Sequence, residues 1–198
     1  MKPLRRVTGR VAVLDRENVD TDQIIPKQFL KRIERTGYGE FLFYDWMKDP
    51  QFELRDRAYA GAEILIAGRN FGCGSSREHA AWALEDYGFR VVLAPSFGDI
   101  FRSNAIKSGL GPIEVPREEL DRLADAVREW NELTVDIEAG EVTHPNGLRV
   151  PFALDPYARE TLVHGLDDVA RTLAREDRIS AYERTHPAHG DTRAVAVP

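Results

Sequence analysis

The chain has 198 residues, enough to bury one good core, and this length favours a single domain. The formal net charge at pH 7 is −6, with lysines and arginines scattered along the sequence, which argues against nucleic acid as the main partner. No apolar run approaches the roughly 20 residues that cross a bilayer. The basic residues 1–6 are not followed by the apolar segment of a secretory signal, so we expect a cytoplasmic protein without membrane contact.

The only cysteine is Cys73, so an internal disulfide is excluded, as is usual in a reducing compartment. Iron–sulfur clusters usually take several thiolate ligands. We therefore expect no cofactor and no metal site built by this chain alone. Cys73 itself is expected to be a small packing residue rather than a ligand.

In the first third of the chain, apolar runs alternate with charged or glycine-containing segments. Residues 11–14 predict a short strand, followed by a carboxylate-rich loop over 15–22. A proline then precedes a predicted helix over 27–34. The aromatic segment 41–47 is expected to form a short helix on the core, and 64–67 a buried strand.

The rest of the chain continues the alternation of helical and extended patterns. The expected elements are a helix over 78–87, a strand over 90–94, a helix over 97–107, a strand over 113–115, a helix from Pro116, three antiparallel strands over 133–137, 141–143 and 148–152, and one or two helices over 157–182. Strands joined through helices imply some parallel pairing, hence an α/β fold. We expect one domain over 1–186 and a disordered polar tail over 187–198.

A glycine-rich loop follows the strand predicted at 64–67. It is Gly68-Arg69-Asn70-Phe71-Gly72-Cys73-Gly74-Ser75-Ser76-Arg77-Glu78-His79-Ala80. Glycines permit tight turns and close approach to a ligand, and the start of the following helix favours negative charge. The planar guanidinium of Arg77 suits a carboxylate or phosphate. The loop therefore predicts an anion-binding site.

Three common glycine-loop motifs do not fit this segment. A phosphate-binding P-loop needs a lysine that is absent, and a dinucleotide loop needs glycine where Arg77 stands. A hydrolase nucleophile turn needs glycine where Glu78 stands. An ordinary strand–helix turn with serine caps remains as the structural alternative.

Several motifs, in order along the chain, carry a resemblance to a known family. They are residues 18–26, 29–32, 70–80, 94–101, 165–168 and 175–183. Together they resemble the swivelling domain of aconitase-type hydro-lyases and, more narrowly, the family of bacterial 3-isopropylmalate dehydratase small subunits. The resemblance covers roughly 1–186 and implies a swivelling β/β/α domain like the aconitase C-terminal domain, followed by C-terminal helices.

The resemblance also implies a two-chain hydro-lyase of leucine biosynthesis. Such an enzyme isomerises 2-isopropylmalate to 3-isopropylmalate through 2-isopropylmaleate, so its substrate is a small dicarboxylate. The large subunit carries a [4Fe-4S] cluster, and the small subunit is expected to be inactive alone. Two alternatives stay open: the small subunit of a sister hydro-lyase acting on homoaconitate or citraconate, or a non-catalytic anion-binding module.

The family's Ser-Ser-Arg motif implies roles for three residues of the glycine-rich loop. Ser75 matches the base that takes a proton from the carbon next to a carboxylate. Arg77 is expected to pair with a substrate carboxylate. Ser76 is either a helix cap or a helper of the oxyanion. His79 is expected to be a structural, hydrogen-bonding histidine.

Other expected substrate contacts come from the amino-terminal motifs. Asp22 matches an active-site aspartate of the family, with a loop-capping carboxylate as the alternative. Lys31 and Arg32 fall in the family's substrate-reading segment, where Arg35 could serve as well. A solvated helix face is the alternative for this charged run.

Overall fold

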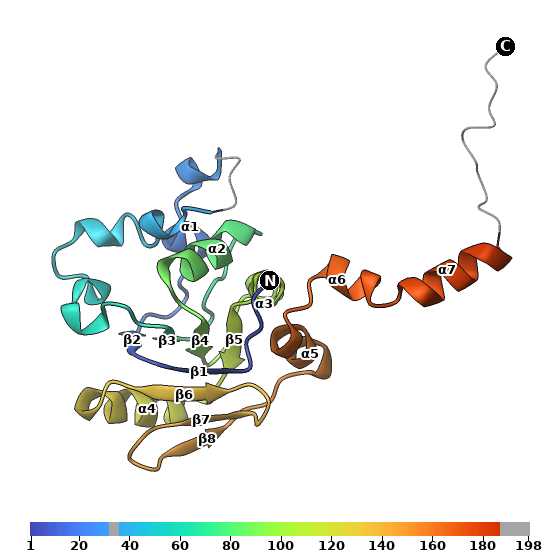
Figure 1. Ribbon diagram of the computed structural model, residues 1–198. Coiled ribbons are helices and arrows are strands. Elements are labelled where there is room, and N and C mark those ends of the chain that lie inside the picture. The colour runs from blue at the N-terminus through green and yellow to red at the C-terminus, as the bar shows by residue number, and fades with distance from the viewer. Residues whose placement is uncertain (32–35, 187–198) are drawn as a thin grey trace.

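The computed structural model describes residues 1–31 and 36–186. Figure 1 shows two sheets in separate layers, with helices above the upper sheet and beside the lower one. The described residues do not include the tail predicted over 187–198. They also do not include residues 32–34 of the helix predicted over 27–34. Within them, 27–31 forms a 3₁₀ turn.

The central sheet is parallel and has the order β2-β3-β4-β5. Its strands are β2 (Val11–Leu14), β3 (Ile64–Ala67), β4 (Val91–Ala94) and β5 (Gly111–Glu114). Every residue of β3 and β4 is buried, because both faces of the sheet are covered. This double burial explains why the strands were predictable as uninterrupted apolar runs.

The second sheet is antiparallel and has the order β1-β6-β7-β8. Its strands are β1 (Arg6–Gly9), β6 (Leu133–Asp136), β7 (Glu141–Thr143) and β8 (Arg149–Pro151). The last three were predicted, but β1 was not. Only one of its four residues is buried, and its partner β6 lies far along the chain, so no local pattern marks it.

Seven α-helices lie within the described ranges: α1 (Thr21–Ile24), α2 (Glu78–Tyr87), α3 (Asp99–Ser108), α4 (Arg117–Glu129), α5 (Pro156–His164), α6 (Asp168–Leu173) and α7 (Glu176–Thr185). The predicted loop over 15–22 ends in α1. The single helix predicted over 41–47 is wrong, because 3₁₀ turns at Gly39–Phe41 and Trp46–Lys48 flank Phe43, whose φ is +49°. Phe43 stacks on Trp46 with ring centroids 5.4 Å apart, so aromatic packing replaces helical periodicity there.

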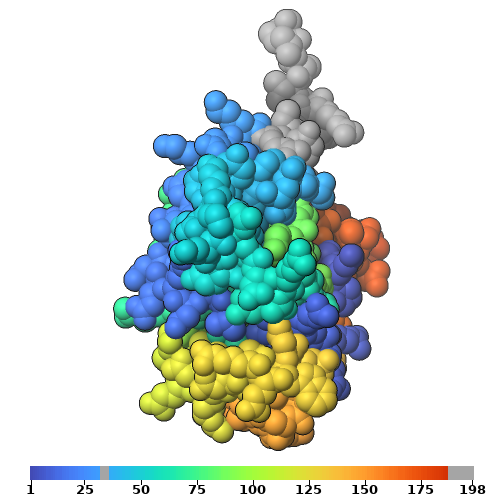
Figure 2. Space-filling view, turned by 90° about the vertical axis from the view of Figure 1, so that its left-hand side faces the viewer, coloured from blue at the N-terminus to red at the C-terminus, as the bar shows by residue number. Residues whose placement is uncertain are grey.

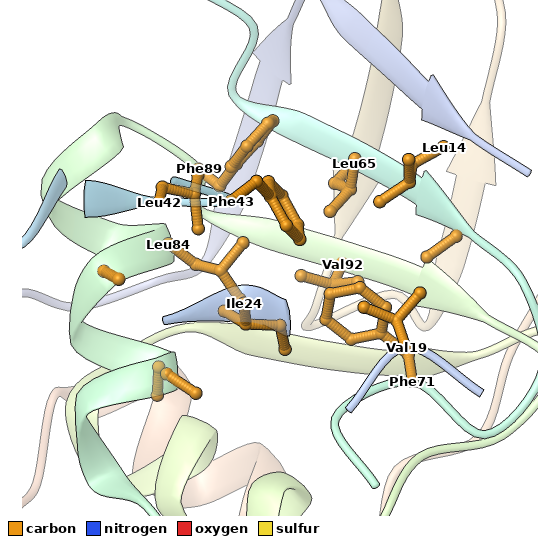
Figure 3. Close-up of a cluster of buried hydrophobic side chains, with 14 of the residues drawn as sticks. Leu14, Val19, Ile24, Leu42, Phe43, Leu65, Phe71, Leu84, Phe89 and Val92 are labelled. Carbon is orange, nitrogen blue, oxygen red and sulfur yellow. The ribbon is translucent and has the colours of Figure 1, made fainter. Parts of the chain in front are cut away.

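Two apolar cores lie on opposite faces of the parallel sheet. Leu65 and Val92 face the core under α1 and α2, whereas Ile64 and Val91 face the antiparallel sheet and α4 and α5. Figure 3 shows the first core, in which aromatic side chains from several loops meet the strands. Figure 2 shows the segment 36–60, in cyan, on the surface of the layer that contains the parallel sheet. The antiparallel sheet, in yellow and orange, lies below it.

The carboxyl-terminal helices α6 and α7 extend away from the two sheets (Figure 1). Val169, Leu173 and Tyr182 on these helices are exposed. Within 1–31 and 36–186, no helix combines the length and the apolar character needed to cross a membrane.

Candidate functional site

The glycine-rich loop lies where the carboxyl ends of β2, β3 and β4 meet, the edge at which parallel sheets commonly bind ligands. The loop is bonded on both sides. The Gly72 N–H donates to the Val19 carbonyl after β2 (2.7 Å), and the Phe71 N–H donates to the Ser96 carbonyl after β4 (3.1 Å). The turn is therefore held by its two neighbouring loops.

Gly72 is required by close packing at a left-handed backbone position. Its φ is +73°, and a Cβ built there would lie 2.2 Å from the Phe101 ring of α3. At this position the glycine brings the loop against α3 rather than against a ligand.

Ser75 and Ser76 are exposed at the end of the loop. Arg77, in an extended conformation, occupies the N-cap position of α2, and no side-chain hydrogen bond caps this helix. Neither Ser75 nor Ser76 therefore occupies the N-cap position, which was one of the alternatives for each. Neither hydroxyl has a hydrogen-bond partner among the described residues, so both are available to a ligand or a second chain.

Arg77 and Asp22 form an ion pair between the loop and α1. Both Nη atoms of Arg77 donate to the Asp22 carboxylate, Nη2 to Oδ2 at 2.8 Å. The Arg77 side chain is 13% exposed and that of Asp22 50%. The hydrogen bond from Arg77 is the main cause that lowers the pKa of Asp22. Asp22 thus engages two of the five N–H donors of Arg77.

His79 packs among aromatic rings on the first turn of α2. Its ring lies 4.8 Å from that of Trp82 and 5.1 Å, edge-on, from that of Tyr38. Burial is the main cause that lowers the pKa of His79, and it favours the neutral imidazole. Its side chain has no hydrogen bond to a described residue, so ring packing replaces the expected hydrogen-bonding role.

Burial raises the pKa of the Cys73 thiol, which disfavours the thiolate form of a metal ligand.

The predicted substrate-reading segment is only partly described. Lys31 is exposed at the end of a 3₁₀ turn (Lys27–Lys31). Arg32 and Arg35 lie outside the described residues. Phe29 of this turn stacks on Phe41, with ring centroids 4.1 Å apart, and anchors the turn to the core.

Two neighbours of Asp22 serve the local structure. Asp20 is the N-cap of α1, where its carboxylate accepts from the Gln23 N–H (2.8 Å) and Gln23 Oε1 accepts from the Asp20 N–H (2.9 Å). Thr21 is buried and bonded to the glycine-rich loop, a contact that was not predicted from the sequence. The only local signal was a small polar residue between two aspartates.

Within 1–31 and 36–186, no cluster of three or more His, Cys, Asp or Glu side chains could hold a metal ion.

Comparisons with known proteins place this architecture in a class. Residues 1–118 match the family described as the aconitase C-terminal domain, so the chain belongs to that family. The chain is also 52% identical over 190 residues to the 3-isopropylmalate dehydratase small subunit of Bacillus velezensis, covering 92% of this chain and 96% of that one. With the small subunit of Rubrobacter xylanophilus it shares 51% identity over 191 residues, covering 96% and 97%.

A solved structure agrees with the sequence comparisons. The crystal structure of a 3-isopropylmalate dehydratase from Methanocaldococcus jannaschii superposes with a TM-score of 0.67 and 28% identity, covering 89% of this chain and 99% of that one. The chain therefore belongs to the family of 3-isopropylmalate dehydratase small subunits. The family resemblance and the fold class expected from the sequence are confirmed.

Proposed function

We propose that this chain is the small subunit of a hydro-lyase that isomerises 2-isopropylmalate to 3-isopropylmalate through 2-isopropylmaleate, in leucine biosynthesis. The observation that carries the proposal is the exposure of Ser75, two residues before Arg77, in a chain 52% identical to a named small subunit. An exposed hydroxyl can be covered by a second polypeptide, whereas a buried one could not.

In this proposal Ser75 takes the proton from the carbon next to a substrate carboxylate. A serine hydroxyl is a weak base in water, so its alkoxide needs stabilisation. The positive end of the α2 dipole and the positive guanidinium of Arg77 supply it. Arg77 binds a substrate carboxylate through the donors that Asp22 leaves free, and Asp22 orients the guanidinium. Ser76, Lys31 and Arg32 are further proposed substrate contacts.

The dicarboxylate substrate and the partner chain are part of the same proposal. The donor set of this chain does not suit a [4Fe-4S] cluster, since Cys73 is the only cysteine. We place the cluster on the large subunit, where it would act as a Lewis acid on the departing hydroxyl. The chain alone is then inactive. We also propose that residues 1–186 act as one domain in the cytoplasm.

Anaerobic purification of the chain with its large subunit tests the proposal. Absorbance of the unsaturated intermediate should appear with 2-isopropylmalate, and the variant Ser75→Ala should lower kcat by at least about 10²-fold without changing assembly. Unchanged turnover of Ser75→Ala would place the base elsewhere. Equal or faster turnover of homoaconitate or a citraconate-type diacid would overturn the assignment of substrate.

A further inference from the structure

Thr21 is a buried polar residue bonded directly to the main chain of Ser75. The residue is 1% exposed, and within the described ranges only His144 and Thr161 are comparably buried polar residues. The Thr21 hydroxyl donates to the Ser75 carbonyl at 3.0 Å, although the two residues are 54 positions apart. A buried hydroxyl without a partner is destabilising. The hydrogen bond to the Ser75 carbonyl offsets the cost of burying the Thr21 hydroxyl.

The main chain of Thr21 is bonded to the same loop. Its N–H donates to the Cys73 carbonyl (2.9 Å), and the preceding Val19 carbonyl accepts from the Gly72 N–H (2.7 Å). Three hydrogen bonds in succession therefore join 19–21 to 72–75. Only the bond to Ser75 uses a side chain, so only that bond depends on which residue stands at position 21.

Gly74 makes the hydrogen bond between the Thr21 hydroxyl and the Ser75 carbonyl important. It lies between the two carbonyls that Thr21 binds, and its φ of +91° is a conformation that other residues rarely adopt. A glycine next to Ser75 leaves the serine main chain free to rotate unless another contact restrains it. The helix that carries Thr21 is itself fixed, because Asp20 and Gln23 form a reciprocal capping box at its start.

We infer that Thr21 is a positioning residue for the proton abstraction, whose hydroxyl sets the direction of the Ser75 main chain and hence of Ser75 Oγ. The inference rests on the proposed function. Thr21 is buried and does not touch substrate. Its contribution follows from geometry, since a displacement of about 1 Å at a reacting group can lower a rate by about 10²-fold.

The test compares Thr21→Val, which removes the hydroxyl at similar volume, with Thr21→Ser, which keeps it. In the anaerobically assembled enzyme, Thr21→Val should lower kcat for 2-isopropylmalate about 10-fold or more, with KM changed less than about twofold. Thr21→Ser should restore kcat to within about threefold of the wild type.

Thr161→Val is the matched control. Thr161 is also buried, and its hydroxyl accepts a hydrogen bond from Arg171 Nη2 at 2.6 Å, on α5 rather than at the glycine-rich loop. This variant should lower stability but leave kcat unchanged. Hydrogen exchange of the small subunit adds a readout that does not depend on activity: amides of 72–80 should exchange faster in Thr21→Val than in Thr21→Ser.

Each outcome separates the two proposals. A wild-type assembly without activity on 2-isopropylmalate overturns the proposed function. An active wild type with kcat retained in Thr21→Val, or not restored in Thr21→Ser, overturns only the role of Thr21. If Thr21→Val does not fold, Thr21→Ala takes its place. If neither variant folds, the Thr21 hydroxyl is needed for folding of the whole chain. That result would also overturn a role of Thr21 that is confined to positioning Ser75.

Discussion

Replacing Arg77 by lysine tests whether its guanidinium binds substrate or only pairs with Asp22. Both Nη atoms of Arg77 donate to the Asp22 carboxylate. Lysine keeps the positive charge but cannot present a planar pair of donors while leaving others for a second carboxylate. The variant Arg77→Lys therefore removes the geometry of the guanidinium and retains the charge.

The two interpretations of Arg77 predict effects of different size. Because half of the Asp22 side chain is exposed, the ion pair contributes about 1 kcal/mol or less to stability. For a chain of this length, such a loss lowers Tm by about 2–4 °C at most. A hydrogen bond between charged groups in the bound complex contributes about 1.5–3 kcal/mol. Its loss lowers kcat/KM by roughly 10- to 150-fold, so the effect on activity should exceed the effect on stability.

The assay measures kcat/KM for 2-isopropylmalate in the assembled enzyme and urea unfolding of the small subunit. Arg117→Lys is the control, because Arg117 also binds a carboxylate through two Nη atoms, with distances of 2.7 and 3.2 Å to Asp15, and its Nε pairs with Asp121 at 2.9 Å. Both variants should lose a similar, small amount of stability, and only Arg77→Lys should lose activity. Equal kcat/KM values for the two variants would show that Arg77 serves the fold alone.

Two further variants test the electrostatics and the packing of the site. Arg77 lowers the pKa of Asp22 below its ordinary 3.8, so the stabilisation is present above that value and is lost as the pH falls through the lowered pKa. Urea unfolding should therefore show the wild type and Asp22→Asn converging in stability below pH 3.8; a difference constant from pH 7 to pH 2 would contradict the ion pair. Gly72→Ala should lose about 2–5 kcal/mol, because a strained φ and a clash with Phe101 add together. Gly147→Ala, with φ +95° and open space around it, should lose only about 1–2 kcal/mol, and equal losses would refute the steric argument.

Local patterns were sufficient where a segment's own residues set its structure. The strands at 64–67 and 91–94 are buried on both faces, so their apolar runs marked them directly. Helix α2 begins at Glu78, in the last part of the glycine-rich segment, as predicted. The helix predicted over 41–47 is wrong because the structure there depends on contacts between side chains. Stacking of Phe43 on Trp46 outweighs helical periodicity.

The sequence by itself determined the strands of the parallel sheet, the glycine-rich loop that leads into α2 and, through several ordered motifs, the family. Only the tertiary structure decided that β1 pairs with β6, that Arg77 binds Asp22 55 positions away, and that Thr21 holds the main chain of Ser75. The physical reason is that apolar runs, their periodicity and the conformational freedom of glycine can be recognised from adjacent residues. The partner of a buried hydroxyl or a guanidinium depends on which distant loops the parallel sheet brings to the same edge.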